Sequence, residues 1–403
     1  MSTVFRLEPA DKALVYELIE TLSKKVANHV SDTTIPHGLL SGLAGELLFL
    51  FKAHQFNPEF VEESVFQEQL DVLQEGLGEQ SLELSNGLAG QAWLLEYFNQ
   101  SAPDEYDPEL LSEIDELFTN ALKQSPWSGE LEMVLGLAGY SPYAARRARH
   151  ADQTELFDAI VSGFESTVSQ LNLKHLTWAQ PKESVYLFDR QSNEAEYNLG
   201  LAHGVPGIIA ALLPAVRVPS LTLRTKRLLE GGCEWLLAQR NPKQDDYACF
   251  GTCVGDQHRS RLGWCYGDLT IALTLARVGL ELQRDDFIES ALEIALHSAS
   301  RDESSAVIYD AGLCHGSLGL ATIFQAMNQL LPHPELAAAA DRWLHIFLAN
   351  YKEKGESALY FYDAQNKCYT ENFGFLMGYS GMALSLIGVV DDRLDWIDSL
   401  LMA

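Results

Sequence analysis

Two cysteines and three further polar residues stand one or two positions before glycines in three separate segments of the chain. His203 precedes Gly204 in the first of these segments. Cys265 and Tyr266 precede Gly267 in the second, and Cys314 and His315 precede Gly316 in the third. Two thiolates and an imidazole can hold zinc and leave a fourth position open for water or substrate. A free cysteine is also a common small core residue, so burial of Cys265 and Cys314 in the core is the alternative.

These segments belong to a signature that recurs along the chain. Its central glycines are spaced 45 to 68 residues apart: Gly42, Gly87, Gly136, Gly204, Gly267, Gly316 and Gly378. A second glycine follows three positions later in six copies, and Thr270 replaces it in the fifth. In this alignment Cys265 and Cys314 share the column two residues before the central glycine. His203, Tyr266 and His315 share the next column, which a closed ring of repeats would bring to one cavity.

The segments that carry the signature are predicted to be helical. An apolar run of helical length follows most signatures, which is typical of a helix buried on every side. More amphipathic segments lie between them, at 108–123 and 284–298. We expect an all-α fold, an arrangement of about seven helical pairs, each with an inner and an outer helix. Residues 140–199 are polar and tyrosine-rich, and we expect a small insertion there, with short strands, between the third and fourth repeats.

Length and composition restrict the class of protein. The 403 residues include 47% hydrophobic residues, and the formal net charge is −28. This charge disfavours nucleic acid as a partner and permits a cationic peptide, although solubility alone would also account for it. We expect one domain over residues 1–403 and no membrane span. Six cysteines are too few for a disulfide framework, and the N-terminus lacks a signal sequence, so we expect a cytoplasmic protein.

The motifs resemble those of the lanthionine synthetase C-like family, the lanthipeptide cyclases. The resemblance rests on RLGWCYG at 261–267, LCHG at 313–316 and NLGLAHG at 198–204, and it covers roughly residues 15–400. It implies an α,α-toroid, a closed barrel of helical pairs, with one zinc ion at its centre. It further implies that the zinc ligands are Cys265, Cys314 and His315.

The resemblance also implies which residues surround the reaction. His203, Arg261 and Tyr266 would line the catalytic cavity. A family aspartate four residues before the third central glycine corresponds to Glu132, a carboxylate longer by one methylene; a solvated acid at a helix start is the alternative. The implied reaction adds a peptide cysteine thiol to dehydroalanine or dehydrobutyrine. The substrate would be a dehydrated precursor peptide, and a separate dehydratase would be a partner.

Three other functions stay open on the sequence. Addition of glutathione to dehydrated residues in proteins would use the same zinc chemistry. A zinc prenyltransferase subunit would need a basic diphosphate pocket, and the low content of Lys and Arg argues against it. The third is a peptide-binding scaffold in which zinc is structural. Cys249 and Cys253 could form a second metal site, but structural roles are favoured for both.

Overall fold

The computed structural model describes residues 4–75, 81–180, 197–242, 248–255 and 260–403. The described part is mostly helical. The α-helices are α1 (Pro9–His29), α2 (Leu43–Phe56), α3 (Glu63–Glu75), α4 (Leu88–Ser101), α5 (Ser112–Leu122), α6 (Ser141–Arg147), α7 (Thr154–Thr167), α8 (Val205–Leu212), α9 (Thr222–Leu237), α10 (Asp268–Leu282), α11 (Asp285–Ala299), α12 (Glu303–Ala306), α13 (Ser317–Leu330), α14 (Pro334–Lys354) and α15 (Tyr379–Asp391). The 3-10 helices are η2 (Leu137–Tyr140), η3 (Leu213–Arg217), η4 (Gly355–Leu359) and η5 (Ile397–Leu400).

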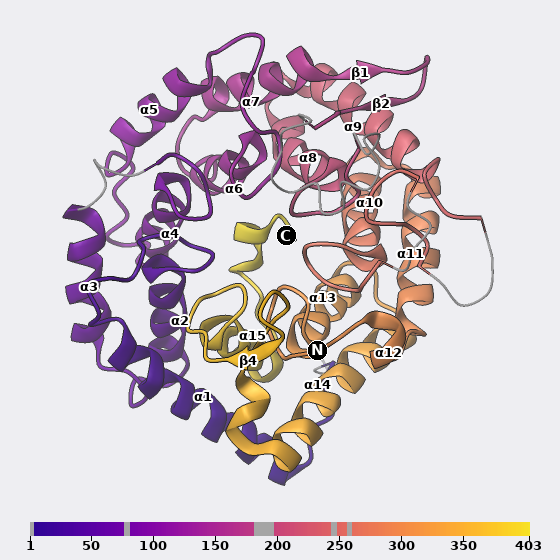
Figure 1. Ribbon diagram of the computed structural model, residues 1–403. Coiled ribbons are helices and arrows are strands. Elements are labelled where there is room, and N and C mark those ends of the chain that lie inside the picture. Colours follow the sequence, from indigo (N-terminus) through magenta and orange to yellow (C-terminus); the bar gives the residue numbers. More distant parts are fainter. Residues whose placement is uncertain (1–3, 76–80, 181–196, 243–247, 256–259) are drawn as a thin grey trace.

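The helices form two concentric rings (Figure 1). Each central glycine of the signature is the N-cap of an inner helix, and the inner helices are α2, α4, η2 with α6, α8, α10, α13 and α15. The inner helices are buried on nearly all sides, as in α13, where every residue from Ser317 to Met327 is buried. The outer helices α5 and α11 fall where the amphipathic segments predict them, and their apolar sides pack inward.

Backbone hydrogen bonds close the seven signatures into a ring. In each signature the carbonyl two residues before the central glycine accepts an N–H from the preceding repeat, and the last repeat donates to the first. The bonds run from Leu40 to Ser85, Ser85 to Val134, Met133 to Ala202, Ala202 to Cys265, Trp264 to Cys314, Cys314 to Leu376 and Leu376 to Leu40, with N···O distances of 2.5–3.3 Å. We call this set the backbone ring. It shows that the repeats form a closed ring rather than an open solenoid.

A glycine four residues before the central glycine lets neighbouring signatures approach closely. A Cβ on Gly38 would lie 2.2 Å from the Ser85 carbonyl oxygen and the Asn86 Cα. A Cβ on Gly263 would lie 2.8 Å from the Cβ of His315, one repeat further on. The first glycine of these signatures is therefore needed because the backbone of the next repeat lies against it.

Gly38→Ala is expected to destabilise the fold by about 1–3 kcal/mol, because the added methyl meets backbone atoms that belong to the backbone ring. Urea unfolding followed by circular dichroism measures this change. Gly232→Ala in α9 is the matched control, since its Cβ would meet the flexible Ile209 side chain at 3.0 Å and alanine favours a helix. Equal stability of the Gly38 variant and wild type would contradict the requirement for glycine where the next repeat lies against Gly38.

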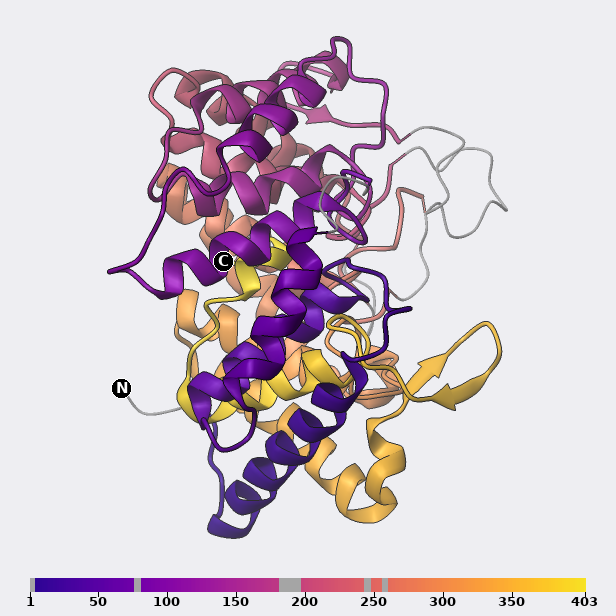
Figure 2. The same cartoon turned by 90° about the vertical axis from the view of Figure 1, so that its left-hand side faces the viewer.

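Short strands interrupt the helical pattern in two places. β1 (Ser169–Gln170) pairs with β2 (Leu176–Thr177) antiparallel, within the segment where an insertion with short strands is expected. Residues 181–196 of that segment lie outside the described residues. A second antiparallel hairpin, which the sequence did not indicate, joins β3 (Phe361–Asp363) to β4 (Cys368–Thr370). It projects away from the helical body (Figure 2).

The last residues of the chain occupy the middle of the ring. η5 lies inside the circle of inner helices (Figure 1), and Trp396, Leu400 and Met402 are buried. The indole of Trp264 donates to the Leu400 carbonyl at 3.0 Å, and Trp264 directly precedes Cys265. The C-terminal segment thus supports the loop that carries one of the candidate zinc ligands.

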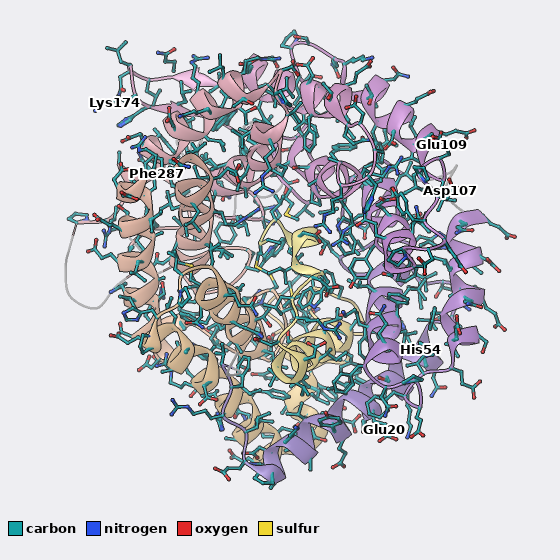
Figure 3. All side chains as sticks on the ribbon, turned by 180° about the vertical axis from the view of Figure 1, so that it is seen from behind. Glu20, His54, Asp107, Glu109, Lys174 and Phe287 are labelled. Carbon is teal, nitrogen blue, oxygen red and sulfur yellow. The ribbon has the colours of Figure 1, made fainter. Side chains whose placement is uncertain are left out.

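Charged side chains lie on the outer rim. Glu20, Asp107, Glu109 and Lys174 project outward from the outer helices and loops in the view from behind (Figure 3). Among the described residues, no helix has both the length and the apolar character needed to cross a bilayer.

Candidate metal centre and catalytic cavity

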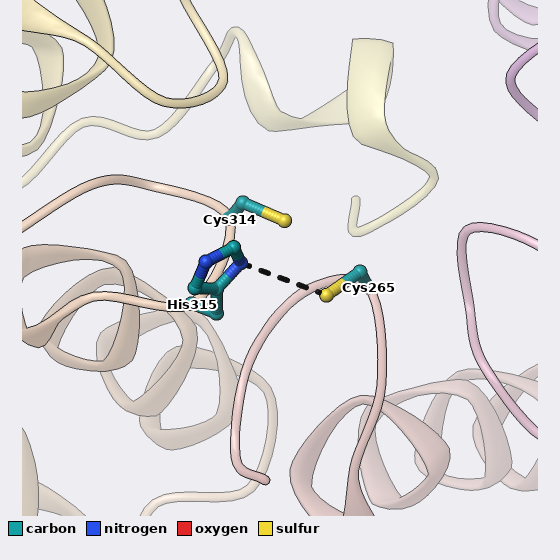
Figure 4. Close-up of side chains that lie close together, drawn as sticks. All are labelled: Cys265, Cys314 and His315. Atoms are coloured by element: carbon teal, nitrogen blue, oxygen red, sulfur yellow. Dashed lines mark hydrogen bonds between the residues drawn. The ribbon is translucent and has the colours of Figure 1, made fainter. Parts of the chain in front are cut away.

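The backbone ring brings the three predicted zinc ligands together. The Sγ of Cys265 lies 3.8 Å from the Nδ1 of His315, and the ligand atoms of Cys265, Cys314 and His315 all lie within 4.8 Å of one another (Figure 4). A tetrahedral ion with bonds of about 2.1–2.3 Å keeps its ligand atoms roughly 3.5–3.8 Å apart. The donor set suits zinc with three protein ligands, and the spacing of Cys265 and His315 falls within this range.

The thiols of Cys265 and Cys314 act on each other's ionisation. The hydrogen bond from the Cys314 thiol holds the pKa of Cys265 well below its usual value against the opposing effect of burial, and His315 and Arg261 lower this pKa further. Burial raises the pKa of Cys314 well above its usual value, and its bond to Cys265 adds to that rise. The pair, together with the nearby His315 and Arg261, therefore favours a negative charge on sulfur, which is the form of cysteine that binds metal.

Arg261 acts on this pair by its charge. Its guanidinium is among the causes that lower the pKa of both thiols, so the positive charge lies close to the sulfur atoms. Arg261 lies six positions before Gly267, at the start of the segment that carries Cys265.

His203 and Glu132 form a second group from the third and fourth repeats. The Nδ1 of His203 lies 2.7 Å from Oε2 of Glu132, whose side chain is fully buried. The same carboxyl accepts the backbone N–H groups of Val134 at 2.9 Å and of Leu135 at 2.5 Å. Glu132 is therefore an acceptor on both oxygens, and Nδ1 of His203 donates to it. The carboxyl of Glu132 is not solvated, contrary to the alternative interpretation of this residue as an exposed helix-start acid.

Tyr266 lies between the two groups. Its ring centroid is 6.3 Å from that of His203, and it follows Cys265 in the chain. Burial raises the pKa of Tyr266 above its usual value, and negative charge at Cys265, Cys253 and Glu132 adds to the rise. The phenol therefore keeps its proton and can donate a hydrogen bond within the cavity.

Asn198 holds the Tyr266 hydroxyl, and sequence reasoning assigned it no role. Its Nδ2 donates to Oη of Tyr266 at 2.7 Å, while its Oδ1 accepts the N–H of Gly200 at 2.8 Å. A signal was present in the alignment, because the position six residues before the central glycine is Asn198, Arg261, Asp310 or Asn372 in four repeats. Asp310 and Asn372 likewise accept the N–H two residues later.

Among the described residues, Cys249 and Cys253 do not occur together in a group of three or more candidate metal ligands. The backbone of Cys253 forms an isolated antiparallel β-bridge with that of Asn198. Cys249 instead lies beside Asp268 and His297, and the potential ligand atoms of these three residues are within 4.8 Å of one another. Asp268 accepts the backbone N–H groups of Cys249 and Phe250 at 2.8 and 3.0 Å, and an Arg301 nitrogen lies 3.4 Å away. The carboxylate is thus engaged in fixing the loop before α10, and burial raises the pKa of Cys249 to about 11.

The closed ring of helical pairs is the fold called an α,α-toroid, and this one has a thiol and imidazole cluster at one end of the ring. The chain matches the family described as "Lanthionine synthetase C-like protein" over residues 33–402, and it belongs to this family. Its fold is similar to the solved structure of nisin cyclase, with a TM-score of 0.69 and 20% identity over 96% of this chain and 97% of that one. The predicted α,α-toroid is confirmed.

A weaker likeness is found to a second solved structure. It is the crystal structure of a sugar epimerase from a ruminal bacterium, with a TM-score of 0.44 and 11% identity over 75% of this chain and 87% of that one.

Proposed function

We propose that this protein is a zinc-dependent lanthipeptide cyclase, which adds cysteine thiols of a dehydrated precursor peptide to dehydroalanine or dehydrobutyrine. The observation that carries the proposal is the meeting of Cys265, Cys314 and His315 within 4.8 Å of one another. Membership of the lanthionine synthetase C-like family supports it. We also infer that residues 1–403 form one domain, since the backbone ring joins the first and last repeats.

In this proposal Cys265, Cys314 and His315 hold one zinc ion. A zinc ion at such a site supplies deprotonation of a coordinated thiol near neutral pH. The substrate sulfur then forms a bond to the β-carbon, the carbon–carbon π bond breaks, and its electron pair passes to an enolate. The reaction ends when the α-carbon receives a proton.

His203 is the candidate for the proton transfer. Because Nδ1 donates to Glu132, Nε2 is the ring nitrogen that can exchange a proton with the substrate. Glu132 fixes the imidazole and stabilises its positive charge when it is protonated. Tyr266 donates a hydrogen bond to the enolate oxygen, and the Arg261 charge stabilises the negative sulfur and enolate groups.

Asn198 is a positioning residue in this scheme. Asn198→Asp is expected to lower cyclisation about tenfold, the effect of one hydrogen bond of roughly 1.4 kcal/mol, since an acceptor replaces the donor to Tyr266. The zinc content should stay at that of wild type, and Tyr266→Phe should make the Asn198 substitution nearly silent. Additive effects in the double variant would contradict the assignment.

A two-substrate assay tests the proposed function. The purified zinc-loaded protein is given either a synthetic peptide with one dehydroalanine and one downstream cysteine, or a dehydroalanine-containing protein with glutathione. A cyclase converts the free thiol of the peptide to a thioether and leaves the mass of the peptide unchanged. The product is therefore recognised because N-ethylmaleimide no longer alkylates it. A glutathione adduct instead would establish the glutathione-adding alternative, and no product in either arm would favour a scaffold.

A further inference from the structure

The column of residues directly before the central glycine continues around the ring beyond the candidate catalytic residues. His203, Tyr266 and His315 fill this column in the fourth, fifth and sixth repeats. The other four repeats carry Ser41, Asn86, Leu135 and Met377, which we call the mouth surface. Each of these residues follows directly on a member of the backbone ring, so the mouth surface lies at the same end of the toroid as the metal centre.

Contacts between neighbouring repeats recur along this column. The Oγ of Ser41 donates to Oδ1 of Asn86 at 3.2 Å, in the same way that His203 lies beside Tyr266 with ring centroids 6.3 Å apart. Neighbouring side chains of the column thus meet in both halves of the ring, at Ser41 and Asn86 in the mouth surface and at His203 and Tyr266 among the candidate catalytic residues.

The mouth surface differs in exposure from the catalytic half. Ser41 and Asn86 are exposed, and Met377 is half-buried. Leu135 is 39% exposed, whereas its ring neighbour His203 is 9% exposed. What distinguishes Leu135 is its position: its own N–H is bonded to Glu132, beside His203, and its apolar side chain is partly open to solvent, so a ligand that reaches His203 would meet it.

We propose that the mouth surface binds the peptide segment that carries the dehydrated residue, with Leu135 as its main apolar contact. Leu135 and Met377 flank the catalytic half on its two sides and fit small aliphatic side chains or the methyl group of dehydrobutyrine. Ser41 and Asn86 lie opposite and fit the amide groups of an extended peptide backbone. The inference rests on the proposed function and names the substrate subsite within it.

Leu135→Asp tests the inference. The variant is expected to raise the KM for cyclisation and the Kd for a fluorescent peptide analogue with serine in place of cysteine, each about tenfold. The kcat should change less than twofold, and zinc content should equal that of wild type. Leu223→Asp, on the outer helix α9 with Leu223 85% exposed, is the matched control and should leave both constants unchanged.

The outcomes separate this inference from the proposed function. Wild-type cyclisation with KM and Kd unchanged in both Leu135→Asp and Leu135→Ala would overturn the mouth surface alone. Peptide binding that depends on Leu135 in a protein without cyclase activity would support the mouth surface and overturn the cyclase.

Discussion

Cys314→Ala is expected to abolish both stoichiometric zinc and cyclisation. The substitution removes one of three protein ligands, and the remaining thiol and imidazole would have to share the ion with two solvent positions. Loss of a supporting residue around a metal ligand already costs about 10–100-fold in affinity, so loss of the ligand itself should cost at least about 100-fold. Metal analysis of the purified protein and titration against a chelating indicator measure this change.

Cys368→Ala is the matched control for that variant. Cys368 is an exposed thiol on β4, outside the cluster, so its loss should leave zinc content and cyclisation unchanged. Thermal unfolding distinguishes loss of the ion from loss of the fold. Full retention of zinc in Cys314→Ala and in Cys265→Ala would remove both cysteines from the ligand set.

His203→Asn is expected to leave zinc in place and to lower cyclisation by about 10²–10⁴-fold. The reason is that asparagine can keep a hydrogen bond to Glu132 but has no group that exchanges a proton near neutral pH. Rates of thioether formation under single-turnover conditions, together with incorporation of deuterium at the new α-carbon, measure the effect on protonation.

Two further variants sharpen the test of His203. His345→Asn should behave as wild type, since His345 lies on α14, a helix on the outside of the ring (Figure 1), where its imidazole is bonded to the Asp341 carbonyl of the same helix. Glu132→Gln should lower the rate less than His203→Asn, and the double variant should be no slower than His203→Asn alone, because Glu132 acts through the imidazole. A His203→Asn protein as fast as wild type would exclude His203 from the mechanism.

Much of the candidate site could be predicted because the repeats share one register. Once the central glycines were aligned, Cys265 and Cys314 had to occupy equivalent places, and the backbone ring joins them directly through Trp264. The pairing of His203 with Glu132 follows the same geometry, since the glycine that five of the other six repeats carry at the Glu132 position lies against the next repeat.

The remaining features depend on contacts that a register cannot reveal. Asn198 looks like any loop asparagine until its amide is seen on Tyr266. The indole of Trp264 is bonded to the buried Leu400, 136 positions away, and no motif near Leu400 indicates this pairing. The β3–β4 hairpin is too short and too exposed for alternation of apolar residues to predict it.

The backbone ring has a consequence for how the chain folds. Its closing bond joins Leu376 to Leu40, so the bond that completes the circle spans most of the sequence. In an open array, folding can start anywhere and spread from unit to unit. Here a nascent chain with six folded repeats would still lack the backbone hydrogen bonds that the seventh repeat makes to the sixth and to the first. The ring around the metal centre would therefore still be open. Closure should therefore be a late, cooperative and slow step, with a strong dependence of folding rate on chain topology.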